Sequence, residues 1–155
     1  MTAETLPDTP VKTMTETYDS AWKDKLLSWD GTAMTYDAIG NMLTRGGTTY
    51  TWTQGRRLSG VENGKSIKYL YDHTGARVKK TVDNTVTEYQ WAGDLLLSEK
   101  TDGRIIWYCY DSQANLIFVT IRGITYFYVR NVQGDIIALV DADGKVVVKY
   151  TSDSW

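Results

Sequence analysis

One turn signal recurs along the sequence about every twenty residues, and this repetition restricts the possible folds more than any other feature. The glycine of the signal falls at residues 40, 55, 75, 93 and 134, and alanine takes its place at residue 114. The successive steps are therefore 15, 20, 18, 21 and 20 residues. A period of this length is typical of repeat proteins, in which one small unit is stacked many times.

A tyrosine-aspartate pair opens the clearest copies of this turn. The pairs and the turn glycines are Tyr18-Asp19, Tyr36-Asp37, Tyr71-Asp72 and Tyr110-Asp111, with Gly40, Gly75, Gly93 and Gly134. In the copy that contains Gly93, we place Tyr89 at the tyrosine position. We expect the tyrosine to end a strand and to lay its ring on the neighbouring repeat. The aspartate carboxylate can accept backbone N–H bonds two residues further on, and the glycine supplies a left-handed backbone conformation.

A second series of turns alternates with the first. Its members are Asp30-Gly31, Gly46-Gly47, Asn63-Gly64, Asp83-Asn84, Asp102-Gly103, Arg122-Gly123 and Asp143-Gly144. Most are dipeptides that favour tight two-residue hairpins. The stretches between turns are rich in β-branched and aromatic residues, as strands are: residues 67–71, 77–82, 85–91, 105–110, 116–121, 124–130, 136–140 and 145–151. The pattern predicts an all-β fold, an antiparallel meander of repeated hairpins over residues 16–155, after a flexible or irregular lead-in at residues 1–15.

Composition fits such a sheet and narrows the classes of partner. The chain has 11 Tyr and 6 Trp but only 2 Phe, and rings with a polar edge suit a sheet with one packed and one wet face. A formal charge of −2 gives no basic field for nucleic acid. The longest apolar stretches, residues 136–140 and 146–148, are too short to enter a bilayer as a spanning helix. The residues after Met1 do not resemble a secretory signal.

Residues 36–41, 71–77 and 128–136, together with the run at 22–26, resemble the YD repeats of bacterial RHS proteins. The resemblance covers about residues 16 to 155. It implies a curved strip or partial shell of β-hairpins, as in the insecticidal toxin complexes and the teneurins, in a secreted or cell-surface protein. It also implies partners: the remaining repeats of a parent protein and a C-terminal toxic cargo. The chain ends at Trp155, before the position of the family's self-cleaving segment, so no aspartate here takes over the cleavage role.

The residues that could carry chemistry favour structural roles, and we predict no catalytic, cofactor or metal site. His73, the only histidine, occupies a variable position of a turn, where an exposed turn residue is expected. The single cysteine, Cys109, lies in an aromatic strand and is expected to be an inert core thiol. Aspartates that recur in every repeat are usually structural, since catalysis needs one asymmetric arrangement. Asp141 and Asp143 lack the further oxygen ligands of a calcium loop, so we interpret them as part of a hairpin turn.

Two functions remain open from the residues. The first is a non-catalytic wall segment that shields a cargo. The second is adhesion to a cell-surface carbohydrate or protein through exposed tryptophan and tyrosine rings, although we expect the indoles to pack between hairpins: Trp29, Trp52, Trp91 and Trp107. So few hairpins cannot close a cage, and we therefore expect open sheet edges that self-associate or are covered.

Overall fold

The computed structural model describes residues 13–151, and throughout this range the chain is all-β, as predicted. Fifteen strands and no helix occur among these residues. They belong to two compact units, residues 1–64 and residues 65–155. In each unit every strand pairs antiparallel with its neighbours in the chain, so each unit is a simple meander of one layer. Most of the predicted lead-in lies outside the described residues, as do the last four residues of the predicted array.

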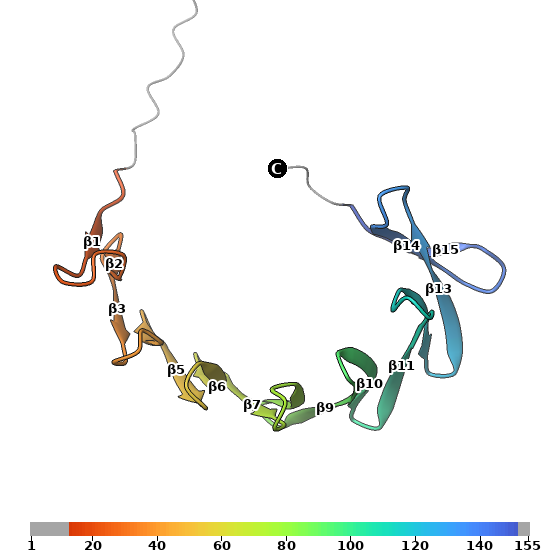
Figure 1. The fold of residues 1–155 in the computed structure, drawn as a ribbon, viewed down its shortest axis with the longest axis horizontal. Coiled ribbons are helices and arrows are strands. Elements are labelled where there is room, and N and C mark those ends of the chain that lie inside the picture. Colours follow the sequence, from red (N-terminus) through yellow and green to blue (C-terminus); the bar gives the residue numbers. More distant parts are fainter. Residues whose placement is uncertain (1–12, 152–155) are drawn as a thin grey trace, which may run out of the picture. The chain divides into compact units, whose positions relative to one another are not determined.

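The first unit, which is red to yellow in Figure 1, contains six strands. They are β1 (Glu16–Tyr18), β2 (Leu26–Trp29), β3 (Thr32–Tyr36), β4 (Met42–Arg45), β5 (Thr48–Thr53) and β6 (Arg57–Glu62). Register shifts occur where a strand meets the next one across a long turn, for example between Thr35 and Tyr36 opposite Met42. Such β-bulges leave one residue out of the ladder.

The second unit continues the same pattern with nine strands. They are β7 (Ser66–Tyr71), β8 (Arg77–Val82), β9 (Thr85–Ala92), β10 (Leu95–Thr101), β11 (Arg104–Tyr110), β12 (Leu116–Ile121), β13 (Ile124–Arg130), β14 (Ile136–Val140) and β15 (Val146–Lys149). Eight of these strands were predicted, and their bounds agree to within about one residue at most ends, except that the last strand is shorter; β10 was not among the predicted stretches.

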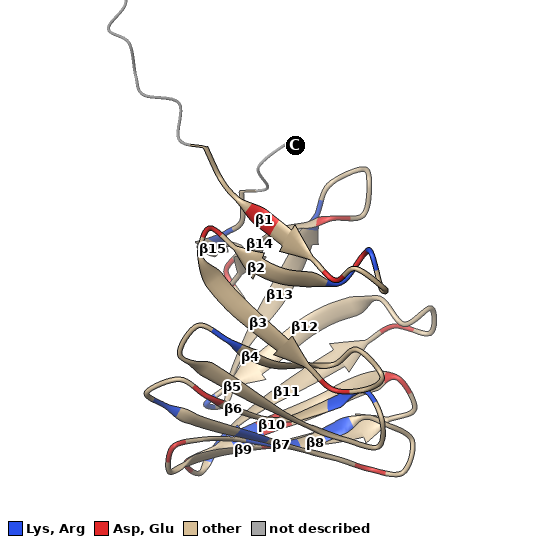
Figure 2. Ribbon diagram, turned by 90° about the vertical axis from the view of Figure 1, so that its left-hand side faces the viewer, with Lys and Arg blue, Asp and Glu red and all other residues tan. Residues whose placement is uncertain are grey.

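Two kinds of turn join the strands, as the two series of signals predict. Two-residue turns hold both residues at positive φ at Asp102-Gly103 (49° and 76°) and at Arg122-Gly123 (53° and 78°). Longer turns, which we call corners, begin with an aspartate or asparagine, as at Asp37, Asp111 and Asn131, and Figure 2 shows acidic residues at turns of the sheet. The prediction of a two-residue turn at Asp143-Gly144 is wrong. This turn is a corner, because the amide of Gly144 donates to the carbonyl of Asp141 at 3.1 Å.

The apolar core is thin, as expected of a single sheet. The hydrophobic residues that are buried among those described are Met34, Val119, Ala138 and Leu139. Stability must therefore come largely from contacts that each hairpin makes with the next along the sheet.

Candidate functional site

The aspartate corners are the first recurring site. In the Asp37 corner, carboxylate oxygen Oδ1 accepts the amides of Ile39 at 3.0 Å and of Asn41 at 2.8 Å. The side chain of Asn41, which is buried, donates to the other carboxylate oxygen at 2.8 Å and to the carbonyl of Gly55 at 2.6 Å. Partial desolvation acts to raise the pKa of the Asp37 carboxyl, but the donors of Asn41, Ile39 and Gly40 outweigh it and lower the pKa.

The same arrangement recurs with different side chains. Asp72 accepts the hydroxyl of Thr74 at 2.6 Å and the amides of Thr74, Gly75 and Ala76, and the Thr74 hydroxyl contributes most to the lowered pKa of this carboxyl. Asp111 accepts the amide and side chain of Asn115, and the side-chain bond contributes most to its lowered pKa. These carboxylates bind the backbone of their own turns, which leaves them committed to structure.

Corners without a tyrosine-aspartate pair use the same bonds. Asn131 Oδ1 accepts the amides of Gln133 and Asp135 at 3.0 and 2.9 Å. Asp141 Oδ1 accepts the amides of Asp143 and Lys145 at 3.1 and 2.9 Å. The carboxylate of Asp141 is therefore occupied by backbone donors. Within residues 13–151 no group of three His, Cys, Asp or Glu side chains is placed to hold a metal ion.

The second recurring site is a pair of large side chains at alternate positions near the end of alternate strands. The pairs are Tyr50 and Trp52, Tyr69 and Tyr71, Tyr89 and Trp91, Tyr108 and Tyr110, and Tyr126 and Tyr128. Side chains two residues apart in a strand share a face, so the pairs of the second unit form two rows on one face. We call this the aromatic face. The alternate spacing of these large side chains is visible in the sequence, but it is not part of the tyrosine-aspartate motif.

In β5, β9 and β11 the second member of the pair closes the preceding corner, in an interaction that we call the corner clamp, and Tyr36 does the same at the end of β3. The hydroxyl of Tyr36 donates to the carbonyl of Leu26 at 2.7 Å, and Leu26 is the register partner of Tyr18 at the bulge of the corner before. Trp52 donates to the carbonyl of Met42 at 2.7 Å, and Met42 is the bulge partner of Tyr36. Each clamp thus supplies a donor to a carbonyl at the place where the ladder is interrupted.

The clamps of the second unit follow the same rule. Trp91 Nε1 donates to the carbonyl of Arg77 at 3.0 Å, and the hydroxyl of Tyr110 donates to the carbonyl of Leu96 at 3.0 Å. Arg130 Nη2 donates to the carbonyl of Leu116 at 3.3 Å. The clamp of the Gly93 copy is therefore Trp91, and our placement of Tyr89 there is wrong. Strand β9 extends to Ala92, so the tyrosine lies two residues further from the turn.

Tyr89 lies on the aromatic face, where several phenols are partly buried. Burial raises the pKa of Tyr89, Tyr108, Tyr110 and Tyr128. For Tyr108 a hydrogen bond to Glu99 Oε1 at 2.9 Å raises the pKa further. The guanidinium of Arg77 lies 5.2 Å from the ring centroid of Tyr69 and 5.5 Å from that of Tyr89. These phenols stay protonated near neutral pH and serve as packing surfaces and donors.

The structure places the only histidine as expected and the only cysteine partly as expected. His73 is exposed in the Asp72 corner. Cys109 is half-buried rather than deeply buried, with its sulfur 4.0 Å from the carbonyl of Tyr110. The described residues contain no helix that is long and apolar enough to span a membrane.

The tryptophans divide into covered and exposed rings. Trp29 and Trp52 are half-buried, whereas Trp91 is 36% exposed and Trp107 is 49% exposed. The prediction that Trp107 packs between hairpins is therefore wrong. Its neighbours Ile106 and Tyr108 lie on the aromatic face, so Trp107 lies on the opposite face, where fewer large side chains cover it.

Comparisons with known proteins agree with this architecture. The family model described as teneurin YD-shell matches residues 8–155. The chain is 33% identical to the tRNA3(Ser)-specific nuclease WapA of Bacillus spizizenii and 34% identical to the tRNA nuclease WapA of Bacillus subtilis. Each alignment covers 99% of this chain but 7% of the relative. A chain of the TcdB2-TccC3-Cdc42 crystal structure has the same fold, with a TM-score of 0.56 and 18% identity, over 82% of this chain and 8% of that chain.

Proposed function

Because the chain belongs to the teneurin YD-shell family, we propose that it forms part of the wall of a structural shell around a cargo domain, within a secreted or cell-surface parent protein. The chain spans 7% of the length of the curated relatives that it matches, so the remaining wall and the cargo are partners supplied by the parent. The names of those relatives suggest a nuclease as the class of cargo.

The corner clamp is the observation that carries this proposal. At five turns of the described chain a bulge carbonyl accepts a hydrogen bond from a side chain of the following hairpin, as the Met42 carbonyl does from Trp52. A unit completed only by its successor is suited to extension into a continuous wall. The aspartates that could have served as acid or base bind the backbone of their own corners instead.

Limited proteolysis of the full-length parent tests the proposal. We expect the cargo to resist protease in the intact parent and to be digested when expressed alone. Replacing Asp72 and Asp111 by alanine removes the acceptors of two corners, and we expect this variant to admit the protease. Asp94→Ala, a change at an exposed aspartate in a two-residue turn, is the matched control and should leave the cargo protected. Equal digestion of the cargo in the intact parent and alone would contradict the proposal.

Carbohydrate binding is a second candidate function, which the exposure of Trp107 favours. Its indole borders a cleft of about 210 Å³ that Glu88, Gln90, Ser98, Lys100 and Ile105 also line. An exposed indole beside polar side chains can stack on a sugar ring while the polar groups bind its hydroxyls. A glycan array tests this: we expect Trp107→Ala to remove binding and Trp91→Phe, on the aromatic face, to retain it. An array on which the unaltered chain binds no glycan would exclude the candidate.

We further propose that the edge strand β15 pairs with the next repeat of the parent, and with a second copy when the chain is isolated. Three consecutive valines of this strand are exposed by 55%, 44% and 40%: Val146, Val147 and Val148. Exposed apolar edge strands promote pairing with another chain. Light scattering of the purified chain should show concentration-dependent dimers, and Val147→Lys should reduce them. A monodisperse monomer at high concentration would contradict this proposal.

A further inference from the structure

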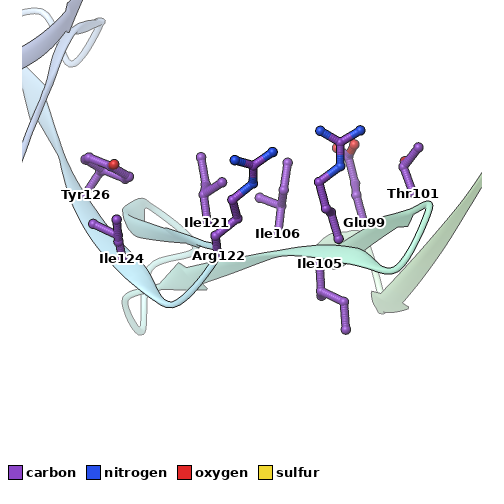
Figure 3. A pocket seen from close by; sticks show the side chains of 9 residues that line it. Glu99, Thr101, Ile105, Ile106, Ile121, Arg122, Ile124 and Tyr126 are labelled. Carbon is purple, nitrogen blue, oxygen red and sulfur yellow. The ribbon is translucent and has the colours of Figure 1, made fainter.

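A hollow on the aromatic face of the second unit is not used by the clamps or the corners. It has a volume of about 430 Å³ and is lined mainly by apolar side chains of β11, β12 and β13. Ile106, Ile121 and Ile124 are register partners across these three strands, so they form one apolar row. Figure 3 shows Ile106, Ile121 and Tyr126 on the same side of the ribbon, whereas Ile105 points to the other side. We call this hollow the isoleucine trough.

The trough continues toward the edge of the sheet. A second hollow of about 310 Å³ shares Ile121 and Tyr126 with it and is completed by Leu139, Val147 and Val148. The two together extend from β11 to β15. Neighbouring strands lie about 4.8 Å apart, so this distance is about 20 Å, the length of an extended segment of about six residues. A surface of this length exceeds what a compact small molecule covers, and Ile124 within it is 55% exposed.

Two arginines stand at the rim of the trough. Arg104 begins β11, and Arg122 lies in the turn between β12 and β13, with its guanidinium directed to the side of the sheet that carries Ile106 and Ile121 (Figure 3). In the described part of the chain, neither guanidinium forms an ion pair. The carboxylate of Glu99, which also lines the trough, accepts the Tyr108 hydroxyl. Two guanidinium groups and one carboxylate line the trough, so positive charge is in excess there and suits a carboxylate beside an apolar segment.

The backbone of Arg122 supports a role beyond that of the turn. Its φ is +53°, at a turn position where Asn, Asp and Gly are favoured because they tolerate positive φ. The equivalent positions of three other turns hold Asp30, Asp83 and Asp102. A long cationic side chain in a strained backbone conformation is a feature that often marks a binding surface.

We propose that the isoleucine trough binds an extended polypeptide segment whose alternate side chains are apolar and whose flanks carry carboxylates. The apolar side chains fill the row of isoleucines, and the carboxylates meet Arg104 and Arg122. The identity of this segment as part of the enclosed cargo rests on the proposed shell function. The peptide-binding chemistry of the trough does not depend on that function.

Fluorescence anisotropy with the complete chain and a labelled peptide tests the trough. The probe has about eight residues, alternating isoleucine and threonine, with glutamate at both ends. Matched probes carry lysine in place of glutamate, or serine in place of isoleucine. We expect the glutamate probe to bind, and both matched probes to bind at least about fivefold more weakly. Equal binding of the glutamate and lysine probes, or no binding of any probe, overturns the inference.

Arg122→Gly separates a role in binding from a role in folding. Glycine fits the positive φ, so this variant should melt at the same or a higher temperature while it binds the probe about fivefold more weakly. Lys68→Gln is the control, because it removes one positive charge from the opposite face of the same unit and should leave binding within about twofold. Unchanged binding by Arg122→Gly overturns the inference. So does tighter binding of dodecanoate, a fatty acid with one carboxylate on an apolar chain, than of the glutamate probe.

Cargo protection in the parent separates this inference from the function on which it rests. Protected cargo together with failed probe binding overturns the trough alone. Arg122-dependent probe binding together with unprotected cargo upholds the trough and overturns the shell function.

Discussion

The contact between Trp22 and Gly40 provides the sharpest test of how the first unit is held together. Gly40 has φ +88°, and a Cβ built there would lie 2.5 Å from the far end of the Trp22 indole. The same indole is 5.7 Å from the ammonium of Lys25, which also lies 5.5 Å from the ring of Tyr36. Gly40→Ala should therefore push the indole off the corner in addition to straining the backbone.

The cost has two parts. A non-glycine residue in the left-handed region costs about 1–2 kcal/mol, and the stiffer unfolded chain returns part of this, which leaves about 1 kcal/mol. Trp22 is 47% exposed, so about half of the ring is covered. Half of a buried tryptophan is about 100 Å², which at about 25 cal/mol per Å² limits the loss to about 2.5 kcal/mol. Because the displaced ring keeps some contacts, we expect about 2–3 kcal/mol in total.

Gly55 offers a matched control in the same unit. Its φ is +83°, and a Cβ there would have no neighbour within 4 Å, so Gly55→Ala should cost only the backbone part of about 1 kcal/mol. Urea unfolding followed by hydrogen-exchange mass spectrometry of residues 13–62 measures the first unit by itself. In a Trp22→Ala background, Gly40→Ala and Gly55→Ala should cost the same. Equal costs for the two variants in the unaltered chain would refute the reasoning.

Three further predictions concern the clamps, a corner and the phenols. Trp52→Phe should lower the free energy of unfolding of the first unit by about 1–2 kcal/mol, because it leaves the half-buried carbonyl of Met42 without its donor. Trp91→Phe, at an exposed ring, should lower that of the second unit by less than about 0.5 kcal/mol. Equal losses in urea unfolding would contradict the role of burial. Ala114→Gly should stabilise the second unit by about 0.5–1 kcal/mol in the same assay, because Ala114 has φ +64° in the Asp111 corner. No gain in stability would show that the backbone at this position is unstrained. The pKa values of four tyrosines are raised in the folded state, which favours folding fully below about pH 10: Tyr89, Tyr108, Tyr110 and Tyr128. The free energy of unfolding should therefore fall as the pH rises above about 10, and it should fall less steeply in Tyr108→Phe. A free energy of unfolding that stays constant from pH 8 to about 11.5 would exclude this contribution of the phenols.

The fold could be predicted from the sequence because its turns are local signals. A tyrosine-aspartate corner and a dipeptide hairpin each need only a few adjacent residues, and their alternation leaves an antiparallel meander as the simplest outcome. A local signal was misleading at one of the turns. Asp143-Gly144 resembles a hairpin dipeptide, but Asp141 binds the amides of Asp143 and Lys145 and makes the turn longer.

Register and exposure were harder to predict because they depend on the neighbouring hairpin. Tyr89 matches the motif by residue type, yet the Gly93 turn has two residues, and this moves the clamp to Trp91. Strand alternation fixes the face on which Trp107 lies, but it does not say how much of that face other side chains cover. The isoleucine trough likewise needs the register that brings Ile106, Ile121 and Ile124 into one row.

The clamp explains why tyrosine in the motif can be replaced without loss of the repeat. Tyrosine, tryptophan and arginine differ in shape and charge, yet Tyr110, Trp91 and Arg130 each donate to a carbonyl fourteen residues earlier. What the position requires is a long side chain that reaches over the adjacent strand with one donor at its tip. The bulge that opens each corner creates this requirement, because it removes a carbonyl from the ladder. The repeat is therefore more uniform in its hydrogen bonds than in its residues, and each clamped corner is complete only when the next hairpin is in place.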